Sequence, residues 1–522
     1  MNPTNLSVGY SSPVDVDDAH QTLHATFATG LTKKLTWRKW QLKQLWWLID
    51  DNEDRIMAAL KADLNRHPVE SMAADIASLK KDILDHIKHL EEWTATTPVN
   101  AGFFEARLFK ARLRKEPLGV ALIIGAWNFP ILLLLQPCIA AIAAGCCVML
   151  KPSELSVDCE KLLVELVPKY LDPRAVRLVT GGASETGYIL SKKYNHIFFT
   201  GSSKVARVIA TAAAKHLTPV VLELGGQGPA IVTKSADVDF AARRIAAAKF
   251  TNAGQICLSV NHVIVEPDVV EEFLERLLHH FSKMLEGEGR SQMCRVVNDR
   301  NFGRLCDMLD STSGSIVFGG ENDPKTRFFQ PTVVRNITAE DSLMSEELFG
   351  PILPVITASL DEAIQITNSL STPLALYLFS RDKDVIETTL DRVLSGGVTV
   401  NNVFFHAAFG DAPFGGVGES GYGAYHGPHG IDCFSHKRTV VEPPKWIDRL
   451  MGFTYAPYRV QDIGKLAVKN NLGFRRGEGM GDQRVGKSNF GVLFAFGAVV
   501  VACGIYFGRE MPFLVSLLDF TS

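Results

Sequence analysis

The spacing of apolar residues is helical over the first part of the chain. From about Thr22 to Trp93, apolar residues recur every three to four positions, as in Trp40-Gln-Leu-Lys-Gln-Leu-Trp46 and again from Ile76 to Leu90. Such spacing gathers the apolar side chains on one face of each helix, where they can pack on a core. This region is therefore predicted to be helix-rich.

A long uncharged stretch follows, from Gly119 to Leu150. A membrane span is one interpretation, but Trp127-Asn-Phe-Pro130 interrupts the run and Pro137 falls inside its second part. The alternative is a strand from Val120 to Gly125, a buried helix from Ile131 to Ala144 and a strand from Cys146 to Leu150. Parallel βαβ units are buried on both faces, which makes continuous apolar runs expected. We therefore predict soluble core here.

Strand-like runs recur afterwards, separated mostly by helical stretches. They are 175–179, 196–200 and 219–224, then 230–233 and 261–265 in a second region that extends from Pro229 to about Val400. This alternation predicts open parallel sheets with helices on both faces, that is, an α/β protein. Residues 401–436 are rich in glycine and aromatics and are predicted to form a structured loop.

The C-terminal tail has a different pattern. Phe490 to Gly508 is uncharged and free of proline, and at ~1.5 Å per residue a helix there would be about 28 Å long, close to the bilayer core. A helix docked on the globule is the alternative, but the glycines and the lack of an amphipathic stripe favour a membrane anchor. More basic residues precede the segment than follow it, which predicts a cytosolic catalytic region. The endoplasmic reticulum is the expected membrane, with the mitochondrial outer and peroxisomal membranes left open.

Composition narrows the class. The 522 residues are 46% hydrophobic and 21% charged, with a net charge of −3, which is typical of a globular protein of two or three domains with large cores and gives no basic surplus for nucleic acid. The nine cysteines include no CxxC pair and no metal-ligand spacing, so we expect a reducing compartment and no metal site.

Candidate chemistry centres on Cys257 in Phe250-Thr-Asn-Ala-Gly-Gln-Ile-Cys257 and Glu223 in Val220-Val-Leu-Glu223-Leu-Gly-Gly226. Small residues around the cysteine let a thiolate meet a substrate carbonyl, and a carboxylate at a strand end can activate water. Asn128, at another strand end, offers a neutral N–H donor suited to an oxyanion. A lone cysteine is most often a structural residue, so the pairing with Glu223 and Asn128 is what matters.

Two segments are suited to a dinucleotide. In His196-Ile-Phe-Phe-Thr200-Gly-Ser-Ser-Lys-Val-Ala206, a strand, a tight turn and a helix N-terminus present free N–H groups to a phosphate. Lys151-Pro-Ser-Glu154 follows a buried strand, and Glu154 can accept hydrogen bonds from a ribose diol. The literal GxGxxG at 416–421 lacks the strand before it and the helix after it, so it is not expected to bind pyrophosphate.

Taken together, these motifs resemble those of aldehyde dehydrogenases, in the same order, over roughly residues 20 to 440. The pattern around Pro413-Phe414, Tyr425-His-Gly and Phe434-Ser-His436, plus the apolar tail, is most similar to the fatty aldehyde dehydrogenase branch, which includes fungal apocarotenal dehydrogenases. The motifs quoted for this resemblance are Pro117-Leu-Gly-Val, Ala126-Trp-Asn-Phe-Pro130, Lys151-Pro-Ser-Glu154, Phe199-Thr-Gly-Ser202, Glu223-Leu-Gly-Gly226, Gly254-Gln-Ile-Cys257 and Glu347-Leu-Phe-Gly-Pro351.

The resemblance implies a role for each matching residue. Cys257 would attack the aldehyde, Asn128 and the Cys257 backbone N–H would hold the oxyanion, and Glu223 would activate the water that hydrolyses the thioester. NAD would be the cofactor, with NADP left open, and no metal is implied. The family commonly has Val-Gly where this chain has Val205-Ala206, which leaves strict cofactor preference in doubt. The implied cofactor residues are Trp127, Lys151, Glu154, Gly201, Ser202, Ser203, Lys204, Val205, Ala206, Glu347 and Phe349.

The resemblance also implies an organisation and a substrate. A Rossmann-type cofactor domain would span 1–226, with part of an oligomerisation element near 98–118, and an α/β catalytic domain would span 227–400. Residues 401–445 would complete the oligomerisation region of a homodimer, 446–488 would be a linker with a short gatekeeper helix near Val460 to Val468, and 489–508 the transmembrane anchor. The substrate would be a long-chain apolar aldehyde, either a fatty aldehyde or an apocarotenal such as β-apo-4′-carotenal. A coenzyme A-acylating dehydrogenase and a catalytically silent membrane-anchored binding protein are the alternatives, and the presence of Cys257, Glu223 and Asn128 disfavours the silent protein.

Overall fold

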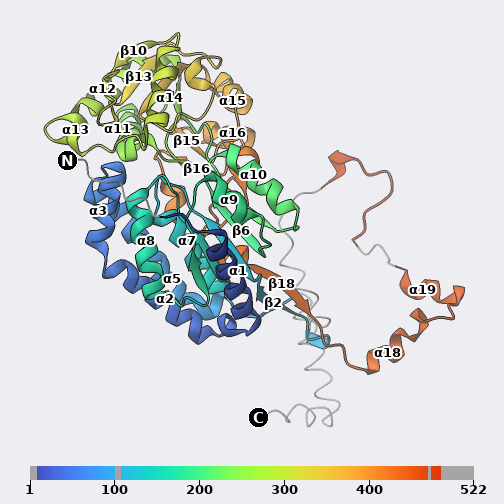
Figure 1. The fold of residues 1–522 in the computed structure, drawn as a ribbon. Coiled ribbons are helices and arrows are strands. Elements are labelled where there is room, and N and C mark those ends of the chain that lie inside the picture. The colour runs from blue at the N-terminus through green and yellow to red at the C-terminus, as the bar shows by residue number, and fades with distance from the viewer. Residues whose placement is uncertain (1–8, 100–106, 468–471, 484–522) are drawn as a thin grey trace, which may run out of the picture. The chain divides into compact units, whose positions relative to one another are not determined.

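The computed structural model describes residues 9–99, 107–467 and 472–483. The chain forms two compact units, one up to Pro443 and one from Pro444 onward. The first unit contains two large sheets, which occupy different parts of it in Figure 1. The predicted α/β class is confirmed by these sheets.

The N-terminal region is helical, as predicted, but it starts earlier than Thr22. Ser12 caps the first helix: its hydroxyl accepts from the Asp15 N–H at 3.3 Å, and the Asp15 carboxylate accepts from the Ser12 N–H at 2.8 Å. This capping box satisfies N–H groups that have no partner inside the helix. The helices are α1 (Pro13–Ala28), α2 (Leu35–Asp50), α3 (Glu53–Leu64), α4 (Pro68–Ser71) and α5 (Ala77–Trp93), with a π-helical turn at Met72–Ile76 before α5.

The first large sheet has six strands in the order β17-β7-β6-β3-β4-β5. All neighbours are parallel except β17, which runs antiparallel to β7. The strand order reverses direction at β3, and ligands of such sheets bind at that point, beyond the carboxyl ends of the strands. The strands are β3 (Val120–Ile124), β4 (Cys147–Lys151), β5 (Val176–Leu178), β6 (His196–Thr200), β7 (Val220–Glu223) and β17 (Gly421–Tyr422); the helices between them are α7 (Leu132–Ala144), α8 (Val157–Tyr170), α9 (Ala183–Leu190) and α10 (Ser203–Ala214).

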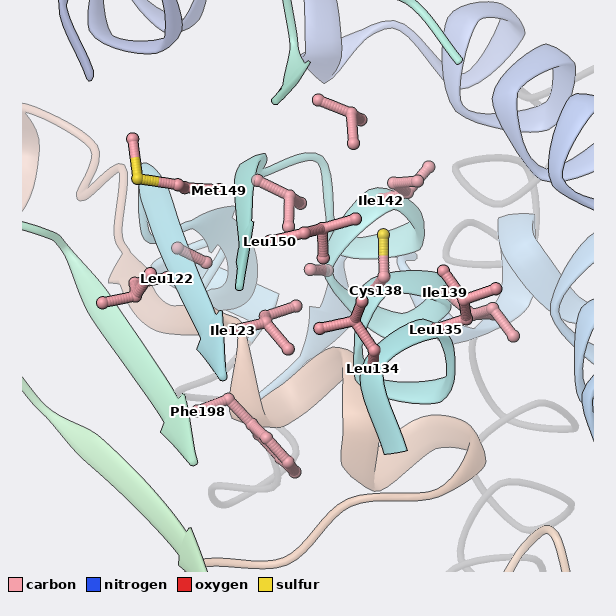
Figure 2. Packing of buried hydrophobic residues seen from close by; sticks show 14 of the residues in the cluster. Leu122, Ile123, Leu134, Leu135, Cys138, Ile139, Ile142, Met149, Leu150 and Phe198 are labelled. Atoms are coloured by element: carbon pink, nitrogen blue, oxygen red, sulfur yellow. The ribbon is translucent and has the colours of Figure 1, made fainter. Parts of the chain in front are cut away.

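The uncharged stretch that begins at Gly119 forms β3, α7 and β4, and every residue of both strands is buried. Figure 2 shows Ile123 and Leu150 on the face of the sheet that looks toward α7, with Leu134 and Cys138 of the helix opposite them. Leu134 is fully buried, and truncating such a leucine to alanine costs about 2–5 kcal/mol. The predicted strand-helix-strand unit, buried in the core, is therefore confirmed.

The second large sheet has seven strands in the order β10-β13-β14-β9-β8-β15-β16, and only β10 is antiparallel to its neighbour. The predicted strands at 230–233 and 261–265 are β8, which lies one residue earlier, and β9, which begins one residue later and ends as predicted. The strands are β8 (Pro229–Val232), β9 (His262–Val265), β10 (Ser315–Phe318), β13 (Thr332–Arg335), β14 (Ile352–Thr357), β15 (Ala375–Phe379) and β16 (Gly397–Val400); the main helices are α11 (Val238–Phe250), α12 (Val270–Leu285), α14 (Asp299–Asp310), α15 (Leu360–Ser369) and α16 (Lys383–Arg392).

A small antiparallel sheet joins the two predicted parts of the oligomerisation element. It consists of β1 (Thr97–Pro98), β2 (Arg112–Pro117) and β18 (Ser435–Val440). The segment before β18 contains a helix that the sequence did not suggest, α17 (Gly427–Cys433), together with 3₁₀ turns at Phe405–Ala408 and Gly418–Ser420. The oligomeric role of this sheet stays a prediction.

The second unit contains only short helices in its described part. The helix predicted near Val460 to Val468 is a 3₁₀ turn (Val460–Asp462) followed by one helical turn, α19 (Ile463–Leu466), and Val468 lies outside the described residues. The predicted anchor at 489–508 also lies outside them. Within the described ranges, no helix combines the length and the apolar character that crossing a bilayer requires.

Candidate active site

The carboxyl edge of the six-stranded sheet presents most of the predicted site residues. β3 leads into Trp127 and Asn128, β4 ends at Lys151, β6 ends at Thr200 just before Gly201, and β7 ends at Glu223. Parallel strands bring their carboxyl ends to one edge, so residues distant in sequence become neighbours.

The turn that carries Cys257 has an unusual backbone. α11 ends at Phe250, and then Asn252, Ala253 and Gly254 all have positive φ, at 48°, 52° and 69°. A β-carbon on Gly254 would lie 2.4 Å from the carbonyl oxygen of Gly350, so glycine is required for this close approach. Left-handed residues other than glycine cost about 1–3 kcal/mol each and are found mainly at functional sites.

The Cys257 thiol lies in a carboxyl-rich environment. The residue is partly accessible, yet protein atoms surround its sulfur, and this burial, with the charges of Glu347 and Glu223, raises the pKa of the thiol to about 12. The backbone N–H groups of Leu258 and Cys257 act in the opposite direction and favour the thiolate. Glu223 and Glu347 are therefore close enough to Cys257 for their charges to affect its ionisation.

Asn128 contacts the same turn. Its side-chain Nδ2 donates to the carbonyl oxygen of Gln255 at 3.1 Å. The residue is buried, and an amide nitrogen carries two hydrogens, so the second N–H can serve another acceptor. The structure thus brings Asn128 and Glu223 to the turn of Cys257, as the sequence predicted.

Glu223 is a buried carboxyl group in an apolar setting. Within the described structure neither of its oxygens has a hydrogen-bond partner, and burial raises its pKa well above the ordinary value. The phenol of Tyr425 is near enough that the Glu223 charge raises its pKa too. A carboxyl group with a raised pKa is suited to accepting a proton from water at neutral pH.

Glu347 lies against the turn that follows Glu223. Burial raises the pKa of Glu347 to about 8, although the Gly226 N–H counteracts this. A β-carbon on Gly225 would meet both Glu347 carboxylate oxygens at 2.3 Å, which explains the glycine there. Phe349 contacts Trp127 edge-on, with 5.3 Å between ring centroids, so the predicted nicotinamide-end residues form one cluster with the strand-end loop of β3.

The predicted adenosine site pairs a buried amine with a carboxylate. Lys151 Nζ donates to Glu154 Oε2 at 2.6 Å, and the Lys151 side chain is 4% exposed against 32% for Glu154. Burial raises the pKa of nearby Glu160 to about 7. The charge of Lys151 lowers this pKa, and the charge of Glu154 raises it. A partly accessible carboxylate beside an ammonium group can bind a ribose diol, so these residues fit the sugar of a dinucleotide.

Residues 196–206 have the predicted strand-turn-helix form, with β6 before the turn at Gly201 and α10 after it. Ser202 caps α10, since its hydroxyl accepts from the Val205 N–H at 3.4 Å, and Ser203 Oγ donates to the Glu419 carbonyl at 3.3 Å. Lys204 and Val205 are exposed and Ala206 is buried. The exposed first turn of this helix, next to Gly201, is suited to a phosphate.

The literal GxGxxG lies elsewhere in the fold. Its residues form the 3₁₀ turn Gly418–Ser420 and the start of β17, with no strand-turn-helix arrangement. Among the described residues, no cluster of three or more histidine, cysteine, aspartate or glutamate side chains could hold a metal ion.

Sequence reasoning missed several buried polar groups around this site. Lys249, one residue before the end of α11, donates to the Gly350 carbonyl at 2.9 Å, and burial lowers its pKa to about 7. Arg66, Asp75 and Asn252 form hydrogen bonds beneath Asn128. Only Asn252 belongs to a segment that the sequence analysis singled out, the run that ends at Cys257. Arg66 and Asp75 come from the helical N-terminal region and Lys249 from α11, and the apolar pattern of those helices indicates packing alone.

The fold is an α/β fold with a doubly wound parallel sheet, and the candidate residues Asn128, Glu223 and Cys257 lie close together near the carboxyl edge of that sheet. The sequence matches the aldehyde dehydrogenase family over residues 4–440. The chain belongs to this family and is an NAD(P)-dependent aldehyde dehydrogenase family enzyme.

Similar proteins agree with this assignment. The chain is 43% identical to a β-apo-4′-carotenal oxygenase of Neurospora crassa, over 84% of this chain and 83% of the relative. It is 38% identical to aldehyde dehydrogenase family 3 member B3 of Mus musculus, over 86% and 94%. A substrate-bound Staphylococcus aureus AldH structure superposes with a TM-score of 0.79 at 34% identity, covering 84% of this chain and 99% of that one. These likenesses place the chain in the family 3-like branch.

Proposed function

We propose that this enzyme oxidises long-chain apolar aldehydes to carboxylic acids, with Cys257 as the nucleophile. The observation that carries the proposal is the convergence of Cys257, the Asn128 amide and the Glu223 carboxyl at one sheet edge. Each group has the chemistry that one step of aldehyde oxidation needs.

In the first step the Cys257 thiolate attacks the aldehyde carbon, and the carbonyl oxygen becomes an oxyanion. The second N–H of Asn128 and the backbone N–H of Cys257 donate hydrogen bonds to it. Neutral donors fixed in a dry site stabilise such charge without reorganising, and removing one typically costs about 10²–10³ in rate. The product of this step is a thiohemiacetal on Cys257.

A bound dinucleotide would supply the hydride acceptor that oxidation of the thiohemiacetal carbon needs. Trp127, Glu347 and Phe349 would border its nicotinamide end, Lys151 and Glu154 its adenosine ribose, and residues 201–206 its phosphates. Loss of the hydride leaves a thioester on Cys257. Glu223 then takes a proton from water, the hydroxide attacks the acyl carbon, and the Cys257 thiolate leaves with release of the acid.

Cofactor preference is proposed to favour NAD over NADP. Glu154 and Glu160 both approach Lys151, and their negative charge would repel a phosphate on the ribose 2′ oxygen. Comparing NADH and NADPH binding by fluorescence titration tests this, and equal affinity would contradict it.

The substrate class is proposed from the tail and the relatives. A long-chain aldehyde gains ~0.8 kcal/mol per methylene by staying in lipid, so an anchored enzyme meets it at its highest concentration. A β-apo-4′-carotenal oxygenase is among the relatives, which supports a polyene aldehyde beside a saturated fatty aldehyde. We propose anchoring by 489–508 in the endoplasmic reticulum membrane, with the catalytic region in the cytosol.

A homodimer is also proposed. β18 is a six-residue strand whose pattern is mostly exposed, and it pairs with β2 along its full length. β18 is also an edge strand of its sheet, and edge strands are common sites of pairing between chains because one side of their backbone is unpaired. Sedimentation of the purified enzyme tests this, and a monomer at micromolar concentration would contradict it.

Turnover with a panel of aldehydes that differ in chain length and unsaturation tests the proposed activity. NADH absorbance should rise with a long-chain aldehyde in the wild type and stay flat in Cys257→Ala. If the wild type is inactive, the silent binding protein is favoured; if product forms only with coenzyme A, the acylating alternative is favoured.

Deleting residues 446–522 tests the proposed membrane role. This removes both the anchor and the segment around α19, where Val460, Ile463 and Leu466 are exposed. Turnover of long-chain aldehydes in vesicles should fall much more than turnover of short-chain ones. Equal losses would contradict the proposal.

A further inference from the structure

A buried arginine connects the two sides of the site. Arg66, just after α3, is 0% exposed, and its Nη1 donates to Asp75 Oδ2 at 2.7 Å. Its Nη2 donates to the backbone carbonyl of Asn128 and, at 2.8 Å, to Asn252 Oδ1. One guanidinium group therefore holds both the loop that carries Asn128 and the turn that leads to Cys257.

The partners of Arg66 are themselves fixed. Asp75 Oδ1 accepts from the Leu132 N–H at 3.1 Å, at the start of α7. Asp75 lies in the π-helical turn Met72–Ile76, and such turns occur frequently at functional sites. The Arg66 guanidinium also packs on the Phe129 ring, 4.5 Å from its centroid. The ion pair is thus anchored to the elements on both sides of Asn128.

Asn252 extends the network to the strained turn. Its Nδ2 donates to the carbonyls of Asn128 and Gln255 at 3.2 and 3.0 Å. Its backbone N–H donates to Glu70 Oε2 at 3.0 Å. The Gln255 carbonyl is also the acceptor of the Asn128 side chain. Asn252 has positive φ, which costs free energy for a residue other than glycine. The conformation of this turn therefore depends on the contacts that surround it.

We propose that Arg66 is a positioning residue for the oxyanion step: by holding the Asn128 carbonyl and Asn252 together, it sets the Asn128 amide relative to the Cys257 turn. This deepens the proposed function and rests on it. A guanidinium can do so because its planar fork donates in several fixed directions at once, whereas a lysine ammonium is a point charge on a flexible stem. A buried ion pair such as Arg66–Asp75 often adds little to the stability of a fold, because removing two charges from water costs about as much as their attraction returns.

A double-mutant cycle between Arg66→Lys and Asn128→Ala tests this inference. If Arg66 acts through Asn128, Arg66→Lys should lower kcat/KM at least ~10-fold in the wild type, since misplacement by about 1 Å can cost ~10²-fold. In the Asn128→Ala background the same change should cost less than about 2-fold. The same factor in both backgrounds, or no loss in the wild type, would overturn the proposal.

Arg38→Lys provides the matched control. Arg38 is also a buried arginine, bonded to the carbonyls of Thr32, Lys33 and Ala143, and it has no contact with the site. This variant should lower the unfolding temperature without changing kcat/KM. A loss of kcat/KM matching that of Arg66→Lys would mean that any buried arginine matters equally, and would overturn the positioning role.

Alkylation of Cys257 by iodoacetamide gives a readout that needs no substrate. Arg66→Lys should speed this alkylation several-fold. Burial disfavours the thiolate of Cys257, and a less ordered turn would let water reach the sulfur and stabilise it. Arg38→Lys should leave the alkylation rate unchanged. An unchanged rate in Arg66→Lys would count against the proposal even if the enzyme's substrate proved to be different. Should Arg66→Lys fail to fold, Asn252→Ala removes the same bridge without stranding a buried charge and should give the same pattern.

Discussion

The pH dependence of Cys257 alkylation follows directly from its surroundings. Burial, Glu347 and Glu223 raise the pKa of this thiol from an ordinary 9.0 to about 12. Only the thiolate reacts, so the rate should keep rising from pH 7 to 11, by up to about tenfold per pH unit and less steeply near pH 8, where Glu347 gains its charge. At pH 8 a thiol with a pKa of about 12 should have about 1000-fold less thiolate than an ordinary thiol. Because a more basic thiolate is more nucleophilic, the net slowing should be about 30- to 60-fold.

The Glu347→Gln variant probes the cause of that shift. The pKa of Glu347 is raised to about 8, so near pH 7 this group is mostly neutral and its removal should change the alkylation rate little. Above pH 9 it is charged and opposes the thiolate, so Glu347→Gln should then react faster, by about 3- to 4-fold for each unit by which the thiol pKa falls, because the less basic thiolate is also less nucleophilic.

The assay is iodoacetamide labelling of the enzyme without added cofactor, with the Cys257 peptide quantified by mass spectrometry. Site resolution is needed because Cys306 and Cys433 are also partly accessible. Cys257→Ala, which lacks the site, gives the background. A plateau in the wild-type rate below pH 9 would refute the reasoning, because it would mean that the thiolate is already formed there.

Three further predictions concern the remaining parts of the site. Glu223→Gln should keep one NADH burst per site in rapid mixing while steady turnover falls about 10²–10⁴-fold, since only water activation is lost; unchanged steady turnover would exclude Glu223 as the base. Lys151→Ala should weaken NADH binding at least ~10-fold in a fluorescence titration, because a charge-assisted hydrogen bond is worth about 1.5–3 kcal/mol; a loss no larger than in Lys215→Ala, at the exposed C-terminal end of α10, would contradict the ribose assignment. Gly254→Ala should lower the unfolding temperature by several degrees, from about 1–3 kcal/mol of strain at φ 69°, whereas Gly303→Ala, on a helix with nothing near its β-carbon, should not; equal effects would contradict the strain argument.

The elements of the fold could be predicted well where the pattern was strong. β3, α7 and β4 fall within one residue of their predicted bounds because two-sided burial makes the run uniformly apolar. The first part of α1, before Thr22, was missed because it lies in an acidic segment, and α17 was missed because it begins with Gly427-Pro-His-Gly. Glycine is unfavourable inside a helix, and although proline is tolerated in the first turn, where Pro428 lies, this short segment has no helical spacing of apolar residues.

The sequence alone predicted the candidate chemistry of the site, because Glu223, Asn128 and the Lys151–Glu154 pair end or follow predicted strands and Cys257 stands among small residues. Only the tertiary structure decided what surrounds them. It brings Arg66 and Asp75, from the helical N-terminal region, beneath Asn128, and it places Glu347 against Gly225 and near Cys257. The reason is physical: residue type and strand ends are local properties of the chain, whereas burial, charge coupling and a shared hydrogen-bond acceptor arise only when distant segments pack together.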